Sequence, residues 1–240
     1  MSQSAMQEIT CPKCGKKTSF LVWDSINTME NPEMKEKVRN DEAFRFHCPE
    51  CGASALLNYN FLYHQQEDKV LIYVSADGED ASEMAQILDQ RGNAFDGYRK
   101  RIVRSYNAFK EKLLILDAGF DDRIVEIIKS SVWDNVEAHY KDKKIDEIYF
   151  ATNDDGVHGF LFRRAGEMVA SMEFDESLYK AIYDSAYERL DAATRNDLYI
   201  DRDWAKDVVV VEGLTNLKEG QKLAAKAVTA EELGLSLEEE

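Results

Sequence analysis

Short runs of β-branched and aromatic residues dominate the first 75 positions of the chain. Such runs, bounded by turn residues, predict β-strands at residues 16–23, 43–48, 53–60 and 69–75. A short helix is expected between the first two strands, from Asn31-Pro32 to about Asn40, because an asparagine N-cap followed by proline favours a helix start. Residues 65–68 stand where a hairpin turn would lie. The pattern predicts a small antiparallel sheet.

Apolar residues recur at three- and four-residue spacing after the polar stretch 76–80. They form one continuous helical face over Phe95–Leu116 and a second over Ile124–Tyr140. Gly119 separates the two stretches, and the acidic residues 121–122 place negative charge where the second helix would begin. We therefore expect two long amphipathic helices in an antiparallel αα-hairpin.

The remaining residues begin with three alternating or apolar runs, 145–152, 157–164 and 167–174. Because turn sequences separate these runs, they predict a three-stranded meander. A helix is expected from about Glu176 to Arg195, and a short strand over Asp207–Val211. The predicted fold class is α+β, with a first domain of about residues 1–140 and a second α+β region of about residues 141–240.

All four cysteines lie in two matching pentapeptides, Cys11-Pro12-Lys13-Cys14-Gly15 and Cys48-Pro49-Glu50-Cys51-Gly52. Two residues between cysteines allow both sulfurs to reach one ion, and two such pairs supply the four thiolates that structural zinc prefers. Proline restricts φ in each turn, and glycine permits a left-handed conformation. The sequence predicts one structural Zn²⁺ bound by all four cysteines, in a zinc-ribbon-like sheet.

A second interpretation of the cysteine pairs stays open. Cys-Pro-x-Cys also occurs in thiol oxidoreductases, so a redox- or zinc-responsive regulator is an alternative. Disulfides are not expected in a reducing cytosol. A closed shell of four thiolates leaves no position for water or substrate, so zinc catalysis is not expected.

The charge of the chain limits its partners. The 46 acidic and 30 basic residues give a net charge of −16, which disfavours a general affinity for nucleic-acid phosphates. The chain lacks an apolar run near 18 residues in length, and its N-terminus lacks the features of an export signal. We therefore expect a cytoplasmic protein with no membrane segment.

One dense basic patch is a candidate for an anion or single-stranded nucleic acid: Arg99, Lys100, Arg101 and Arg104. On a helix, the last three would lie close together on one face. Ion pairing with acidic surface elsewhere is the plainer interpretation in a chain of this charge. A nucleic-acid-associated factor is therefore a further alternative.

Histidines and turn carboxylates supply the other candidates for a functional surface. His64 lies beside the expected hairpin turn, and Asp154, Asp155 and His158 gather at the turn of the meander. Packing at the first site and an ordinary Asp-Gly turn at the second are the alternatives. His47, next to Cys48, and His139, beside the second helical stripe, are interpreted as structural.

The sequence contains no phosphate-loop, dinucleotide-binding, nucleophile-elbow or zincin motif, so it names no catalytic residue. The leading hypothesis is a non-catalytic binding or assembly module. The two helical stripes would otherwise expose much apolar surface, so we expect them to contact the C-terminal region or a second copy, and we predict a homodimer. Residues 141–240, with a net charge of −10, are expected to carry what distinguishes this protein from its relatives.

The N-terminal motifs resemble the bacterial and archaeal CpXC family over residues 8–133. Spaced blocks carry the resemblance: the two cysteine pentapeptides, Ser25-Ile26-Asn27, Asn31 to Lys37, Phe46-His47, Leu62-Tyr63-His64, Arg101 to Arg104 and Gly119 to Arg123. The resemblance implies a shared metal-binding fold and the same four cysteine ligands. The family is named for its motif, so the resemblance implies no activity.

Overall fold

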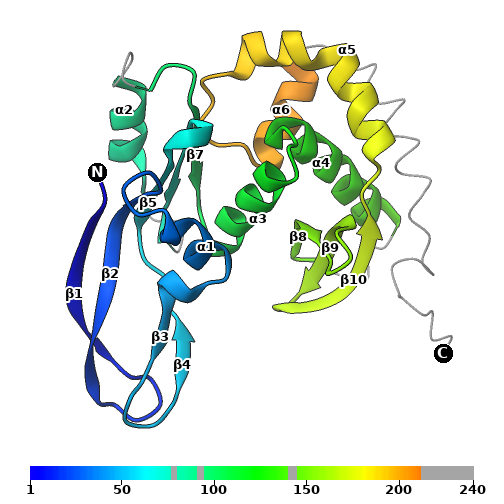
Figure 1. The fold of residues 1–240 in the computed structure, drawn as a ribbon. Helices are drawn as coiled ribbons and strands as arrows, with labels where there is room; N and C mark the ends of the chain where they lie inside the picture. Colours follow the sequence, from blue (N-terminus) through cyan, green and yellow to red (C-terminus); the bar gives the residue numbers. More distant parts are fainter. Residues whose placement is uncertain (77–79, 91–94, 140–144, 212–240) are drawn as a thin grey trace, which may run out of the picture. The chain divides into compact units, whose positions relative to one another are not determined.

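The structure is a computed structural model that describes residues 1–76, 80–90, 95–139 and 145–211. These residues form three sheets and six α-helices (Figure 1), which confirms the predicted α+β class. They divide into two compact units. The first unit comprises the described residues of Met1–Lys110 and Asn196–Leu198, and the second comprises the described residues of Glu111–Arg195 and Tyr199–Glu240.

The first unit is built on a five-stranded sheet with the order β1-β2-β5-β6-β7. Its strands are β1 (Gln3–Thr10), β2 (Lys17–Asn27), β5 (Phe61–Gln65), β6 (Val70–Val74) and β7 (Arg99–Val103). The pairs β1-β2 and β5-β6 are antiparallel, and the pairs β2-β5 and β6-β7 are parallel, so the sheet is mixed and the predicted antiparallel sheet is wrong. A short 3₁₀ turn, η2 (Gln66–Asp68), joins β5 to β6, so the predicted hairpin turn is confirmed.

A second, two-stranded sheet in this unit pairs β3 (Arg45–His47) with β4 (Ser54–Leu56). The predicted short helix is α1 (Glu33–Arg39), and the 3₁₀ turn η1 (Glu42–Phe44) follows it. Helix α2 (Ser82–Gln90) was not predicted from the sequence. Aromatic rings fill the unit's interior, where the fully buried Phe44, Phe61, Tyr63 and Phe109 contact one another at ring-centroid distances of 4.5–5.5 Å.

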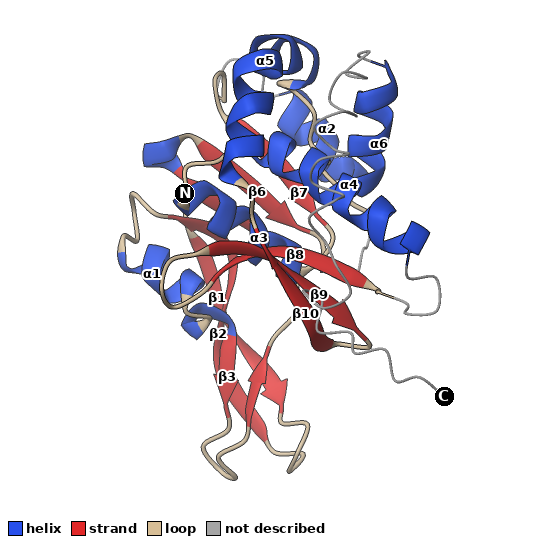
Figure 2. Ribbon diagram, turned by 90° about the vertical axis from the view of Figure 1, so that its right-hand side faces the viewer, coloured by secondary structure: helices blue, strands red, loops and turns tan. Residues whose placement is uncertain are grey.

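The second unit packs helices on a three-stranded sheet with the order β10-β9-β8 (Figure 2). The predicted meander is confirmed, with β8 (Glu147–Thr152), β9 (His158–Arg164) and β10 (Glu167–Glu173) all antiparallel. The helices are α3 (Tyr106–Asp117), which begins in the first unit, α4 (Asp122–His139), α5 (Glu176–Thr194) and α6 (Arg202–Val211). Within the described residues, none of the helices is long and apolar enough to cross a membrane.

Helix α4 and the meander share one hydrophobic core. The buried stripe of α4, which includes Ile124, Ile128 and Val132, packs with Phe150 and Phe160 of the sheet. Sequence periodicity therefore predicted the buried face of α4 correctly as far as Val136, and Tyr140 lies outside the described residues. The first compact unit therefore ends at Lys110 and not at the expected boundary at residues 140–141. The stripe of α4 belongs to the second unit, because residues that follow residue 141 cover it.

The predicted continuous helix over Phe95–Leu116 is wrong. Residues 99–103 form strand β7, and the helix begins only at Tyr106. Ser105 provides the N-cap, because its Oγ accepts a hydrogen bond from the Ala108 amide at 3.1 Å. The apolar residues of β7 and α3 keep a three-to-four spacing across this boundary, so periodicity alone did not reveal the break.

The predicted strand over Asp207–Val211 is also wrong, since these residues end helix α6. Its valine run favours strands by intrinsic preference. An N-cap decides the outcome, because the Asp201 carboxylate accepts a hydrogen bond from the Trp204 amide at 3.0 Å.

Strand β1 was not predicted from the sequence. Nearly all of its side chains are exposed, so its residues do not alternate between apolar and polar.

Charged side chains are buried between α3 and α4 in the second unit. Lys129 Nζ lies 2.9 Å from a carboxylate oxygen of Glu111 and 2.9 Å from one of Glu126. Lys112 Nζ lies 3.1 Å from Asp122 in the same cluster. Burial raises the pKa of Glu126. Although burial favours neutral lysine, the two neighbouring carboxylates raise the pKa of Lys129, which is therefore a buried cation.

Replacing Glu111 with alanine is expected to lower the free energy of unfolding by about 3–5 kcal/mol, because Lys129 would lose one of its two buried counter-charges. The Phe150 amide, 2.6 Å from Glu111 Oε1, would also lose its acceptor. The matched control is Asp134→Ala, which removes an exposed ion pair with Arg202 at 2.9 Å and should cost about 1 kcal/mol or less. Urea unfolding of both variants measures the difference, and equal costs would contradict the prediction.

Candidate metal centre

The four cysteine sulfurs converge although their two loops are far apart in the sequence. All four Sγ atoms lie within 4.8 Å of one another. The Sγ atoms of Cys11 and Cys51 are 3.7 Å apart, and those of Cys14 and Cys48 are also 3.7 Å apart. A tetrahedral zinc site with Zn–S bonds of about 2.3 Å has sulfur–sulfur edges of about 3.8 Å. The cysteine cluster can therefore hold a metal ion.

Each Cys-Pro-x-Cys motif forms the loop of a β-hairpin. The first loop joins β1 to β2 and the second joins β3 to β4, and the two loops lie side by side at one end of the first unit (Figures 1 and 2). Both loops have the same backbone hydrogen bonds. The donor–acceptor distance is 2.8 Å from the Cys11 amide to the Lys16 carbonyl and from Cys48 to Ala53, and 2.9 Å from Gly15 to Cys11 and from Gly52 to Cys48. Two equivalent turns thus present their thiols to a common point.

A glycine closes each of these loops in the left-handed region, with φ of +70° at Gly15 and +67° at Gly52. A Cβ atom at either position would have no heavy atom within 4 Å. The requirement for glycine is therefore conformational and not a matter of space. The glycine role inferred from the pentapeptides agrees with this geometry.

The cysteines differ in their exposure to solvent. Cys11 and Cys48 are 1% and 2% exposed, Cys51 is half-buried, and Cys14 is exposed. Phe46 packs with Cys11 and Cys48 in a small cluster of its own, and Phe20 contacts Phe46 edge to face at 6.1 Å. Because so few apolar side chains are buried there, a metal cross-link would supply much of the stability of this end of the unit.

The backbone around the first loop favours ionised sulfur at one position. The Cys14 amide, helped by the Lys13 amide, lowers the pKa of the Cys11 thiol to about 6. The Lys16 amide acts similarly on Cys14, but loss of hydration and the neighbouring sulfurs outweigh it and raise the pKa of that thiol to about 12. Four thiolates at this spacing therefore need a cation between them.

His64 lies in strand β5, where it is half-buried. Its Nε2 lies 3.3 Å from the Tyr98 hydroxyl, and its ring contacts those of Phe95 and Tyr98. These contacts agree with the packing interpretation of His64, and its role in a functional surface stays a prediction. Burial and the positive charge of the N-terminus lower the pKa of His64, and Glu30 and Glu67 act in the opposite direction.

The basic residues 99–104 do not share a helical face, because Arg99, Lys100 and Arg101 lie in β7. Arg101 is 3% exposed, and its guanidinium donates to the carbonyls of Lys100 and Asp197. Lys100 Nζ donates to the Leu88 carbonyl at 3.2 Å. Arg104 follows the strand and is exposed. Anion contact by this patch stays a prediction, without the helical placement on which it was based.

The meander turn places Asp154 and Asp155 in solvent and His158 at the start of β9. The Asn153 side chain organises the turn by accepting hydrogen bonds from the amides of Asp155 and Val157. His158 Nδ1 lies 3.0 Å from the Thr152 hydroxyl, and the His158 ring stacks on Phe150. Within the part of the chain that the structure describes, the four cysteines are the one group of potential ligands at metal-binding distances.

An open cleft beside His158 is also lined by Glu173, Phe174, Asp175 and Glu176. Asp175 is the N-cap of α5, since its carboxylate accepts a hydrogen bond from the Leu178 amide at 3.0 Å.

The two remaining histidines lie away from this cleft in the sequence. His47 is exposed at the end of β3, and the side chain of His139 lies outside the described residues.

A comparison with known protein families identifies the part of the chain that contains the four cysteines. The sequence profile of a family described as CpXC protein matches residues 9–129, just over half of the chain. The chain belongs to the CpXC family. This confirms the resemblance seen in the spaced motifs, and all four cysteines lie inside the matched segment. No curated protein and no solved structure matched the chain.

Sequence reasoning did not find the aromatic side chains that support the CpXC cysteines. Phe46 precedes Cys48 by two residues, so the pleat of an extended chain would place both side chains on one face. Phe20 lies two residues before the buried Val22 in β2, so both side chains point to the same face of the strand. Period-two alternation was therefore a usable signal for both positions.

Gly15→Ala is expected to weaken metal binding by the cysteine cluster by about 5- to 30-fold, because a left-handed alanine costs roughly 1–2 kcal/mol. The matched control is Gly156→Ala, which has the same kind of backbone (φ +81°) and equally open surroundings, but lies in the meander turn. This control should leave the affinity for the metal ion unchanged. Competition with a chromophoric chelator measures both, and equal affinities for the two variants would contradict the prediction.

Protonation of His64 is expected to destabilise the folded chain. Since its pKa is lowered on folding, the unfolded state binds more protons at this position, and stability falls as the pH drops below the unfolded value of about 6.5. His64→Gln should therefore lose less stability than the wild type between about pH 7 and pH 5.5. Thermal unfolding at each pH tests this, and parallel pH profiles would refute it.

Proposed function

We propose that the protein binds one structural Zn²⁺ through Cys11, Cys14, Cys48 and Cys51 and serves as a non-catalytic binding or assembly module. The observation that carries the proposal is the closed set of four sulfurs at tetrahedral spacing. An all-thiolate tetrahedron favours zinc over hard cations, and it leaves no open position for a substrate. Two hairpins that present equivalent loops make this part of the unit zinc-ribbon-like.

The proposed zinc would connect hairpin β1-β2 to hairpin β3-β4. Each hairpin contributes one buried and one more accessible cysteine, Cys11 with Cys14 and Cys48 with Cys51. The chain's own residues orient these thiols through the loop amides and the packing of Phe46. Thiols in this arrangement suit a reducing compartment, so we place the protein in the cytoplasm.

A redox-responsive role is the second candidate, and the exposure of Cys14 favours it. In such a role, two thiolates would give two electrons to hydrogen peroxide, form one disulfide and, with two protons, yield two waters while zinc leaves. A disulfide between two sulfurs that are 3.7 Å apart, Cys11 with Cys51 or Cys14 with Cys48, would link one hairpin to the other. Zinc release by micromolar peroxide, reversed by thiol reductant, distinguishes this role from a purely structural site.

Elemental analysis of protein purified under reducing conditions is expected to give one zinc per chain. Cys48→Ser should lose the metal, and with it the slow amide exchange of the β3-β4 hairpin, because zinc binding and folding are coupled. Ser54→Ala is the matched control, since it changes an exposed residue of the same hairpin that is not a ligand. Wild-type protein without bound metal would refute the zinc proposal.

A further inference from the structure

Strand β1 forms an open edge of the five-stranded sheet. It pairs with β2 on one side, and among the described residues no strand pairs with its other side. The opposite edge, β7, is covered, because the Ile102 amide donates to the Leu198 carbonyl at 2.8 Å and Arg101 donates to the Asp197 carbonyl. An uncovered edge of eight residues offers a row of backbone donors and acceptors to another strand.

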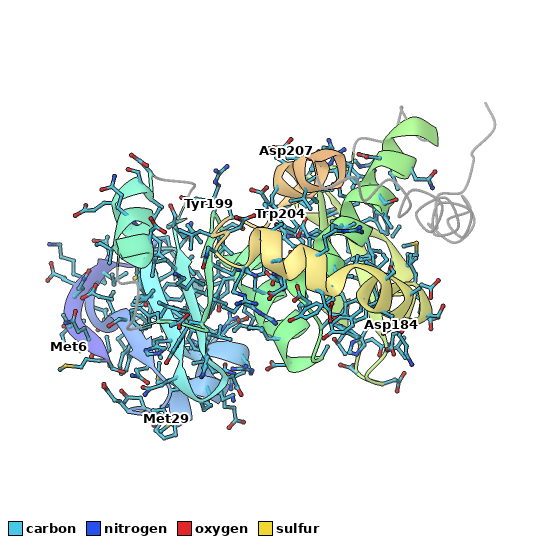
Figure 3. The ribbon with its side chains drawn as sticks, turned by 90° about the horizontal axis from the view of Figure 1, so that it is seen from above. Met6, Met29, Asp184, Tyr199, Trp204 and Asp207 are labelled. Atoms are coloured by element: carbon cyan, nitrogen blue, oxygen red, sulfur yellow. The ribbon has the colours of Figure 1, made fainter. Side chains whose placement is uncertain are left out.

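The composition of β1 does not protect this edge. Proteins commonly block exposed edges with proline, lysine or several charges, and β1 contains one charged residue, Glu8. Met6 is 63% exposed on the outer side of the strand (Figure 3). Leu21, its register partner on β2, is 40% exposed and lies on the same face. An apolar pair therefore adjoins the open edge.

Strand β10, an edge strand of the three-stranded sheet, is less suited to pairing with a second copy than β1. Antiparallel pairing of β10 with a second copy about Ala170 would place Glu167 opposite Glu173 at both ends, which is unfavourable. The same pairing of β1 about Met6 places Glu8 opposite Ser4. Like charges therefore oppose self-pairing of β10, and no like charges oppose self-pairing of β1.

We propose that two copies of the chain associate through antiparallel pairing of their β1 strands, centred on Met6. This pairing would join two five-stranded sheets into one and bring Met6 and Leu21 of each copy into a single apolar patch. The distribution of charge supports this location. The whole chain carries a net charge of −16, whereas most of the charge in Gln3–Thr10 and Lys17–Asp24 is neutralised by the Glu8–Lys17 ion pair, whose atoms are 2.6 Å apart. One charge remains in these two segments. Two acidic copies meet there with little repulsion.

The inference rests on the proposed assembly role and names its partner as a second copy. The helical stripes, on which the sequence suggested a dimer, do not supply this surface. The stripe of α4 is buried in the core of the second unit. The β1 edge does not involve the cysteines, so zinc binding and dimerisation can be measured independently.

Sedimentation velocity over about 1–100 μM tests the proposal, a range in which weak and moderate dimers dissociate. The wild type is expected at twice the 27.5 kDa of one chain. Met6→Lys should raise the dissociation constant at least tenfold, because two lysines would face each other at the dimer axis. Met168→Lys is the matched control, a 66% exposed methionine on the edge strand β10, and should leave the dimer intact.

A photo-crosslinking amino acid at position 6 gives a second readout that needs no charge substitution. Illumination should give a covalent dimer from position 6 and none from position 168. A wild-type monomer at every concentration, or Met6→Lys dimers of unchanged affinity, would overturn the proposal. Zinc content is measured in the same samples: one zinc per chain in a monomeric protein would refute the β1 dimer and leave the metal proposal standing.

Discussion

Four sulfur atoms within 4.8 Å cannot all carry negative charge unless a cation lies between them. This electrostatic constraint governs the end of the first unit where the two hairpins meet. The loop amides favour a thiolate at Cys11, whereas the crowding of sulfurs opposes one at Cys14. Few apolar side chains are buried around the cluster, so the thiols and the cation that we propose for them are the main link between the two hairpins.

The sequence predicted the features whose signal is local. The cysteine spacing, the existence of the short helix α1, the stripe of α4 and the turns of the meander each depend on a few adjacent residues, although the predicted Asn31 side-chain cap of α1 is absent. The failures occurred where two local signals compete. Periodicity merged β7 with α3 and the valine run indicated a strand in α6, and in both cases a side-chain N-cap, Ser105 or Asp201, decides the structure.

Other features could not be predicted because they depend on tertiary contacts. The charged residues of α3 and α4 have the sequence signature of a solvated helix face, yet Glu111, Glu126 and Lys129 are buried because they pair with one another. Basic residues behave similarly in β7, where backbone carbonyls satisfy Arg101. Strand β1 is recognisable only from its partner β2, since its own side chains are mostly exposed.

The family match ends at residue 129, within α4, and this position has a consequence for what can fold alone. The side chains that cover Ile124 and Ile128 come from the meander and from α5, beyond the matched segment. A chain cut at the end of the match would expose this apolar stripe to water and would tend to aggregate. The segment recognised by sequence comparison thus ends inside the second compact unit, before the residues that complete the core of that unit. A segment spliced C-terminal to the match must bring an apolar face that fits α4, whatever else it does.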